Sequence, residues 1–213
     1  MPRIIGVDES GKGDFFGPLV VAAFLAPDEA VRELTEFGVR DSKTLTDKRM
    51  LAIDEELRRR FPHAVTVLTP VDYNRHYKEI KNLNVLLARG HAAVIAGVCA
   101  KHEADLAISD KFGKPEHLER ALGLKNCTIP IRQIVRGEAI PQVAAASILA
   151  RARFVREMTL LSERVGMELP KGAASFVDKV GQQLVQKYGV EILTEVAKVH
   201  FKNYARSVKP VLL

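Results

Sequence analysis

Two adjacent acids, Asp8 and Glu9, come directly after a short apolar segment near the start of the chain. That segment, residues 3–7, is rich in β-branched residues and ends at the acids, which is typical of a buried strand running into a loop. The rigid backbone of a strand end fixes a side chain, and the following loop leaves it open to a ligand. Acids in this position are also often simply solvated, so the pair alone leaves both interpretations open.

Two further acids occupy comparable positions in the second half of the chain. Asp110 follows the apolar segment 106–108, and Glu138 precedes a long helical stretch. If the strands that end at Asp8 and Asp110 are neighbours in one sheet, both carboxylates emerge at the same edge, and Glu138 can close the cluster. Carboxylates so close together repel one another, and a cation must neutralise them. Oxygen ligands of this type favour Mg²⁺ or Mn²⁺, so the four acids predict a metal site.

The charge of the whole chain complements this acidic cluster. Lys and Arg number 32 against 26 Asp and Glu, and the formal net charge of +6 favours a polyanionic partner. Two bound cations can hold an attacking water and a leaving oxygen in line across one phosphate. Gly11 and Gly13 allow the protein backbone to approach a sugar and its 2′-hydroxyl, the group that distinguishes RNA from DNA. Together these features predict metal-assisted cleavage of phosphodiesters.

Several other classes of protein are excluded. With 47% hydrophobic residues the chain is globular rather than disordered, and no segment reaches the roughly 20 apolar residues that span a bilayer. The six histidines show no HxxxH or HxH spacing, and we interpret them as surface or packing residues. No Walker or GxGxxG motif is present, so we expect no small-molecule cofactor. Cys99 and Cys127 form no CxxC pair and, without a visible signal peptide, indicate a reduced, cytoplasmic protein.

The elements that position the acids follow from the pattern of apolar residues. Segments 3–7, 18–26 and 64–68 are predicted strands, joined as an antiparallel meander. Further along, the pattern predicts helices at 82–103, 115–122, 142–161 and from after 172 to about 199, and strands at 105–110 and 127–135. Asn82 is suited to cap the first of these helices. The prediction is an α/β fold with a mixed sheet, in one domain, 1–213, with a helical C-terminal extension from about residue 165.

Five motifs, in order along nearly the whole chain, resemble the type 2 ribonucleases H, the family of ribonucleases HII and HIII. They are GVDESGKGDFFGPLVVAA at residues 6–23, VRDSKTLTDK at 39–48, AISDKFG at 107–113, GEAIPQVAAASILARARF at 137–154, and the pair LPKGA and HFKNY near the end. The last pair is similar to ribonuclease HIII in particular. DSK or AAAS alone would occur by chance, whereas five motifs in the same order are highly specific.

This resemblance implies a ribonuclease H-like fold flanked by helices. It also implies endonucleolytic cleavage of the RNA strand of RNA/DNA hybrids, which leaves 3′-hydroxyl and 5′-phosphate ends. The catalytic and metal-binding positions of the family are matched by Asp8, Glu9, Asp110 and Glu138. The fourth acid is often Asp in ribonuclease HII, so Glu138 departs from that branch in a way that ribonuclease HIII relatives can share.

Two groups of residues match substrate-binding positions of the family. Gly11, Lys12 and Gly13 match a glycine, variable, glycine loop that holds the RNA backbone and its 2′-hydroxyls. Lys12 lies between the two branches, since ribonuclease HII usually has Arg there and ribonuclease HIII a small polar residue. Positions that contact phosphates are matched by Ser42, Lys43 and Ser147. The alternatives are a solvated loop lysine for Lys43 and a small helix-packing residue for Ser147.

Two departures from the family bear on the substrate. The aromatic segment with which ribonuclease HII recognises a single ribonucleotide is replaced by LPKGAASFVD at 169–178, which favours uniform hybrids. The N-terminal substrate-binding domain typical of ribonuclease HIII does not precede Asp8, so we expect Lys198, Lys202 and Arg206 to compensate by binding phosphates. Incision at single ribonucleotides in duplex DNA stays as an alternative activity, and a non-catalytic hybrid-binding module as an alternative class. We expect the protein to act as a monomer.

Overall fold

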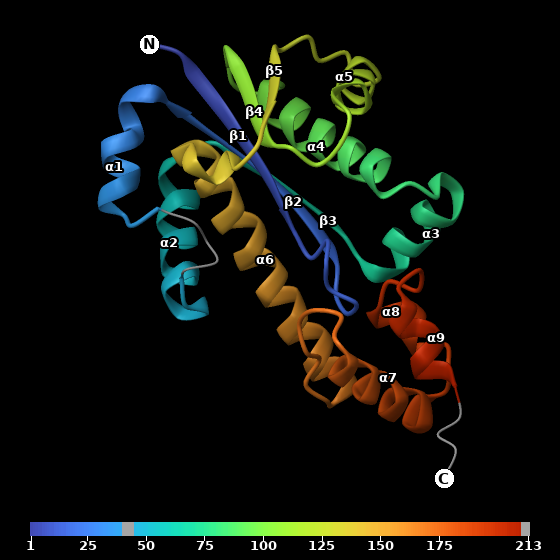
Figure 1. Cartoon of the computed structure of the whole chain (residues 1–213). Helices are drawn as coiled ribbons and strands as arrows, with labels where there is room; N and C mark the ends of the chain where they lie inside the picture. The colour runs from blue at the N-terminus through green and yellow to red at the C-terminus, as the bar shows by residue number, and fades with distance from the viewer. Residues whose placement is uncertain (40–44, 210–213) are drawn as a thin grey trace. The chain divides into compact units, whose positions relative to one another are not determined.

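The structure, a computed structural model, describes residues 1–39 and 45–209. Within these residues, five strands form one sheet in the order β3-β2-β1-β4-β5, with β1 at its centre (Figure 1). The strands are β1 Arg3–Ser10, β2 Leu19–Pro27, β3 His63–Leu68, β4 Leu106–Asp110 and β5 Ile131–Ile134. The α-helices are α1 Val31–Glu36, α2 Asp47–Arg60, α3 Pro70–Ile80, α4 Leu83–Cys99, α5 Pro115–Gly123, α6 Pro141–Val165, α7 Ser175–Tyr188, α8 Ile192–Val196 and α9 Lys202–Val208. Short 3₁₀ helices cover Asp28–Ala30 and Gly137–Ala139.

Pairing within the sheet brings two of the predicted acids to neighbouring positions. β1 runs antiparallel to β2 and parallel to β4, with Val7 opposite Ser109. Asp8 and Asp110 each lie one residue beyond that pair. β4 pairs in parallel with β5, so the sheet is mixed and the predicted α/β fold is confirmed. β1 continues past Asp8 to Ser10 because its last three residues still pair with β2.

The centre of the sheet is buried because its strands are almost wholly apolar. Every residue of β2 except Pro27 is buried, as expected for a strand covered on both faces. At the start of α6, Val143 packs with Ile4 of β1 and Ile108 of β4. Gly6 of β1 allows this approach, because a Cβ there would lie only 2.1 Å from the backbone carbonyl of Gln142. The first turn of α6 is therefore packed directly against the central strand.

One predicted strand is shorter in the structure, and one predicted helix is interrupted. The strand predicted at 127–135 is confined to Ile131–Ile134, since Pro130 has no N–H for the ladder and Cys127 bonds back to Leu122 at the end of α5. The helical stretch predicted after 172 is interrupted after α7. Gly189 takes φ +84° and ends that helix, since a left-handed residue cannot continue a right-handed helix. Asn82 caps α4 as predicted, accepting from the backbone N–H groups of Asn84 and Val85.

Residue contacts divide the chain into two compact units. Unit 1 comprises Met1–Ser10, Val20–Thr66 and Asn82–Arg153, and unit 2 comprises Gly11–Leu19, Val67–Lys81 and Phe154–Leu213. Unit 2 thus contains the predicted C-terminal extension together with two earlier segments, one of which carries Gly11, Lys12 and Gly13. No helix within the described residues is long and apolar enough to cross a membrane. The predicted acids lie in unit 1 and the predicted glycine loop in unit 2.

Candidate active site

Asp8, on the central strand of unit 1, carries a half-buried carboxylate whose pKa is raised. Its Oδ1 accepts a hydrogen bond from the backbone N–H of Glu9 at 2.8 Å, and its carboxylate also accepts one from the hydroxyl of Ser147 on α6. Burial raises the pKa of Asp8 to about 6, and the negative charge of Glu9 adds to the rise. The two hydrogen bonds lower the pKa without cancelling the rise. A half-buried carboxylate with an acidic neighbour is electrostatically suited to bind a cation.

Glu9 is held by His91, which the sequence predicts to be a surface or packing residue. His91, on α4, is fully buried, and its Nε2 donates to Glu9 Oε2 at 3.0 Å. The imidazole packs against Phe112, with 4.4 Å between ring centroids. Its Nδ1 has no hydrogen-bond partner among the described residues. His91 therefore fixes the orientation of Glu9, as residues behind the ligands of a metal site commonly do.

Asp110 and Glu138 are connected through a short turn. Asp110 Oδ1 accepts a hydrogen bond from the backbone N–H of Gly137 at 2.9 Å. A Cβ on Gly137 would lie 3.0 Å from the backbone of Asp110, so glycine permits this close approach. Glu138 follows directly in the 3₁₀ helix Gly137–Ala139 and is half-buried. The turn thus ties the chain segment of Glu138 to the end of β4.

The donor set of these four acids fits a hard divalent cation, although their side chains do not converge on one point. Among the described residues, no group of three or more His, Cys, Asp or Glu side chains is placed to hold a metal ion. The carboxylates of Asp8, Glu9 and Asp110 accept hydrogen bonds from Ser147, His91 and Gly137, respectively. Carboxylate oxygens are the ligands that suit Mg²⁺ or Mn²⁺. Binding an ion would require the side chains to turn toward it.

The glycine loop of unit 2 contains two glycines with different structural roles. Gly11 takes φ +88°, and a Cβ there would lie 2.1 Å from the carbonyl oxygen of Pro18, so the fold itself requires glycine. Gly13 is exposed, and a Cβ there would meet nothing within 4 Å among the described residues. Lys12, between them, is half-buried. Gly13 is therefore the member of the pair whose missing side chain the fold does not explain.

The other residues predicted to contact substrate lie in different environments. Ser42 and Lys43 lie outside the described residues. Ser147 is bonded to Asp8, a role that its sequence position alone did not suggest. The expectation that Lys198 binds phosphate is wrong, because its side chain is fully buried and bonded to backbone carbonyls. Of its two proposed companions, Lys202 is exposed, and Arg206 forms an ion pair with Asp178.

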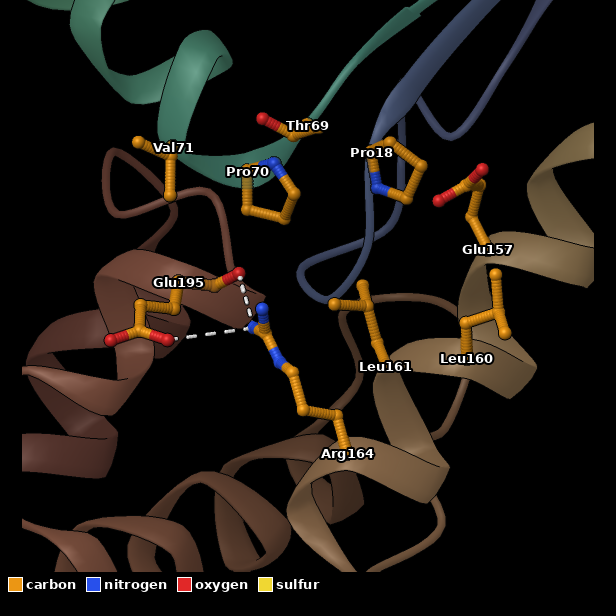
Figure 2. A pocket seen from close by; sticks show the side chains of 9 residues that line it. All are labelled: Pro18, Thr69, Pro70, Val71, Glu157, Leu160, Leu161, Arg164 and Glu195. Carbon is orange, nitrogen blue, oxygen red and sulfur yellow. Dashed lines mark hydrogen bonds and ion pairs between the residues drawn. The ribbon is translucent and has the colours of Figure 1, made fainter.

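A cavity of about 310 Å³ in unit 2 contains none of the predicted site residues. Figure 2 shows Pro18 and Leu161 facing it, with the ion pair of Arg164 and Glu195 at one side. The other side chains lining it are Thr69, Pro70, Val71, Glu157 and Leu160. With one cation and two carboxylates, the lining offers no excess positive charge for a phosphate. The cavity therefore does not resemble a nucleic-acid site.

The strand order and the two acids on neighbouring parallel strands define a protein of the ribonuclease H-like fold. A model of the family described as ribonuclease HII matches residues 5–204. The chain belongs to this family.

The similar curated proteins and solved structures include several named ribonuclease HIII. It is 43% identical over 206 residues to ribonuclease HIII of Chlamydia felis, covering 95% of this chain and 68% of that protein. It is 38% identical over 199 residues to ribonuclease HIII of Protochlamydia amoebophila, covering 93% and 66%. The structure of Bst-RNase HIII in complex with Mn²⁺ matches with a TM-score of 0.90 at 35% identity, covering 97% of this chain and 69% of that one. The ribonuclease HII of a complex with PCNA from Archaeoglobus fulgidus matches with a TM-score of 0.80 at 27% identity, covering 98% of both chains.

Replacing His91 is expected to weaken metal binding. His91→Leu removes the hydrogen bond to Glu9, and we expect Mn²⁺ affinity to fall roughly tenfold or more, since partners behind metal ligands have effects of this size. His91→Gln keeps an N–H donor and should retain more of the affinity. Calorimetric titration of Mn²⁺ into the substrate-free protein measures this directly. The exposed His102→Gln is the matched control, and equal affinities for wild type and His91→Leu would refute the role of His91.

Proposed function

We propose that this protein is a divalent-metal-dependent endoribonuclease that hydrolyses the RNA strand of RNA/DNA hybrids to 3′-hydroxyl and 5′-phosphate ends. The observation that carries the proposal is the pair Asp8 and Asp110, each one residue beyond the paired Val7 and Ser109 of two hydrogen-bonded parallel strands, in a chain of the ribonuclease HII family. Relatives named ribonuclease HIII, at up to 43% identity over most of this chain, support it. The names of these relatives support RNA as the substrate, and the acids support metal-dependent hydrolysis.

The metal site is proposed to consist of Asp8, Glu9, Asp110 and Glu138. When bound, Mg²⁺ or Mn²⁺ would activate a water as nucleophile and stabilise the charge on the leaving oxygen. The protein's own groups would hold the ligands in place: Ser147 orients Asp8, His91 orients Glu9, and the N–H of Gly137 orients Asp110. The long side chain of Glu138, on its short turn, is proposed to complete the set and to position water.

RNA is proposed to be recognised by the loop formed by Gly11, Lys12 and Gly13. The exposed backbone at Gly13 can approach a ribose closely enough to contact its 2′-hydroxyl, and the charge of Lys12 favours a phosphate. We further propose that Ser42, Lys43 and Ser147 contact the phosphates of the substrate. Free thiols at Cys99 and Cys127 suit a reducing cytoplasm, where we expect the protein to act as a monomer.

The proposed specificity is for uniform hybrids rather than single ribonucleotides in DNA. The segment that would carry the recognising aromatic in ribonuclease HII instead bonds to the residues that follow the glycine loop: Gly172 donates its N–H to Asp14 Oδ1 at 2.6 Å, and its carbonyl accepts from Phe15 N–H at 2.9 Å. Cleavage of two end-labelled duplexes, one a uniform hybrid and one carrying a single ribonucleotide, in Mg²⁺ and in Mn²⁺ tests the proposal. Faster incision of the single ribonucleotide would favour the alternative activity, and cleavage of neither would favour a non-catalytic binding module.

Substitution of the two glycines is expected to separate fold from function. Gly13→Ala should leave the free energy of unfolding within about 0.5 kcal/mol of wild type, because the new methyl group meets no atom of the described residues within 4 Å. The same methyl group should obstruct the RNA backbone and raise the KM for hybrids roughly tenfold. Gly11→Ala, by contrast, should lower the free energy of unfolding by about 2 kcal/mol or more, because it collides with Pro18 and strains a positive φ. Urea unfolding and steady-state kinetics measure the two effects, and an unchanged KM for Gly13→Ala would remove this residue from the substrate interface.

A further inference from the structure

Lys198 is a fully buried lysine within unit 2. An ammonium group removed from water is costly unless polar partners replace its hydration. Its Nζ donates hydrogen bonds to the carbonyl oxygens of Asp14 at 2.9 Å and Gly17 at 2.7 Å, and lies 5.6 Å from the centroid of the Tyr73 ring. Burial lowers the pKa of Lys198 to about 7, against the opposing effect of Asp14. Because burying the ammonium group is costly, the two hydrogen bonds of Lys198 are better explained by the position that they give to the bonded backbone than by a gain in stability.

The two carbonyls that Lys198 binds belong to the chain segment that follows Gly13. Asp14 is the next residue after Gly13, and Gly17 precedes Pro18, whose carbonyl lies against Gly11. The lysine therefore bridges the two ends of segment 14–17 with one side chain. A single cationic group that bonds both ends limits how far the segment can open.

Backbone pairing reinforces the same connection. The N–H of Lys198 donates to the carbonyl of Phe15 at 2.8 Å, and the N–H of Gly17 donates to the carbonyl of Val196 at 2.8 Å. Phe16 and Ala197 form an antiparallel bridge. The loop segment thus pairs with residues 196–198 as a short ribbon.

The segment that carries Lys198 is itself held by α3. Asn74 donates from Nδ2 to the carbonyls of Thr194 at 3.2 Å and Ala197 at 2.8 Å, and its Oδ1 accepts from the N–H of Val199 at 3.0 Å. One side chain therefore bonds the backbone on both sides of Lys198. These hydrogen bonds fix the backbone of residues 194–199, from which the side chain of Lys198 reaches segment 14–17.

We propose that Lys198 is a positioning residue, which fixes segment 14–17 and thereby holds the loop of Gly11, Lys12 and Gly13 in the conformation that meets the RNA strand. This inference rests on the proposed function, because it takes the loop as the RNA contact. It assigns a role to a cation that cannot itself reach a phosphate. Lys198 fixes segment 14–17 before substrate binds. Replacing Lys198 should therefore change the mobility of this segment in the free protein as well as the KM for hybrids.

The test compares Lys198→Met, which keeps the length and apolar stem of the side chain but removes its donors, with wild type. Hydrogen exchange of the free protein should speed up at least roughly tenfold at the amides of residues 14–17 and remain unchanged at 106–110 in unit 1. The KM for hybrids should rise roughly tenfold with kcat at saturation changed less than about twofold. Mn²⁺ affinity of the free protein should be unchanged. Lys198→Arg, which retains donors, should restore part of the KM, and Lys179→Met, at an exposed position of α7, is the matched control.

Each outcome bears on the proposal. Unchanged exchange at residues 14–17 overturns it, and so does faster exchange with an unchanged KM in an active enzyme. A fall in kcat with unchanged KM would also overturn it, since that would place the effect at the metal site. If Lys198→Met does not fold, Lys198→Gln, which removes the positive charge and shortens the side chain while keeping an NH₂ donor group, is measured against wild type in the same way. If wild type neither binds nor cleaves hybrids, the proposed function fails, while the exchange measurement still decides whether Lys198 holds the loop.

Discussion

Asp8→Asn is expected to reduce cleavage of RNA/DNA hybrids by roughly 10³-fold or more while leaving hybrid binding within a few-fold of wild type. The substitution removes one negative oxygen from the proposed metal site, and the change in volume is minimal. Asparagine keeps an Oδ1 that can accept from Ser147 and from the N–H of Glu9, so the local hydrogen bonds are preserved. Single-turnover cleavage and equilibrium binding of a labelled hybrid measure the two quantities.

The same substitution is expected to stabilise the metal-free protein. The folded-state pKa of Asp8 is raised to about 6 from 3.8, so the folded protein binds more protons than the unfolded chain between these values. The free energy of unfolding therefore falls as pH rises from about 4 to 6, and the loss, up to about 3 kcal/mol, persists at pH 7. Asp8→Asn removes the titration and should gain about 1–3 kcal/mol at pH 7 and almost nothing near pH 4. Saturating Mn²⁺ should narrow or reverse the difference in free energy of unfolding between the two proteins, because the ion binds the wild-type site more tightly and so stabilises wild type more.

Urea unfolding of wild type and Asp8→Asn at pH 4 and pH 7, with EDTA and with Mn²⁺, checks this prediction. Asp28→Asn, at an exposed position in the 3₁₀ helix Asp28–Ala30, is the control and should change neither activity nor stability. Normal cleavage by Asp8→Asn would show that the proposed site is wrong. Lost cleavage without any gain in stability at pH 7 would show that Asp8 is not under electrostatic strain in the free protein.

Gly6→Ala is expected to lower the free energy of unfolding by about 3 kcal/mol or more. A Cβ at Gly6 would lie 2.1 Å from the carbonyl carbon and oxygen of Gln142 and 2.3 Å from the backbone nitrogen of Val143. These are backbone atoms in the first turn of α6, so no side-chain rotation can relieve the overlap, and the helix must move away from β1. Since the same helix carries Ser147, the displacement should also lower activity.

Gly123→Ala is the matched control for this second prediction. Gly123 is exposed at the end of α5, and a Cβ there meets nothing within 4 Å among the described residues. We expect its free energy of unfolding within about 1 kcal/mol of wild type, with a gain from the reduced entropy of the unfolded chain. Urea unfolding of both variants decides the matter. A Gly6→Ala protein as stable as wild type would mean that α6 does not pack on β1 as closely as described.

Local features of the sequence were sufficient to predict most of the elements and the acidic positions. The β-branched segment before Asp8 and the apolar alternation before Asp110 predict strands, because the pattern of side chains along a strand can be read from residues that are adjacent in the sequence. Asn82 predicts its cap for the same reason, since it bonds to N–H groups two and three residues away. The motifs that resemble type 2 ribonucleases H also led to the family that the comparisons confirm.

Contacts between distant residues could not be predicted in this way. His91 and Glu9 are 82 residues apart, and no spacing in the sequence indicates that a histidine on α4 holds an acid of β1. The sequence likewise treated Gly11 and Gly13 as equivalent, whereas only Gly11 is required by the fold. The difference arises from the carbonyl of Pro18, which the chain brings back against Gly11.

Lys198 shows most clearly what sequence and tertiary structure each decide for this protein. Residues 198–206 include Lys198, Lys202 and Arg206 and no acid, and this local charge predicts that all three cations bind phosphates. In the folded chain, however, Lys198 is buried and bonded to the carbonyls of Asp14 and Gly17, which lie more than 180 residues earlier in the sequence. The physical reason is that charge and period are local properties, whereas burial and pairing depend on where the folded chain returns.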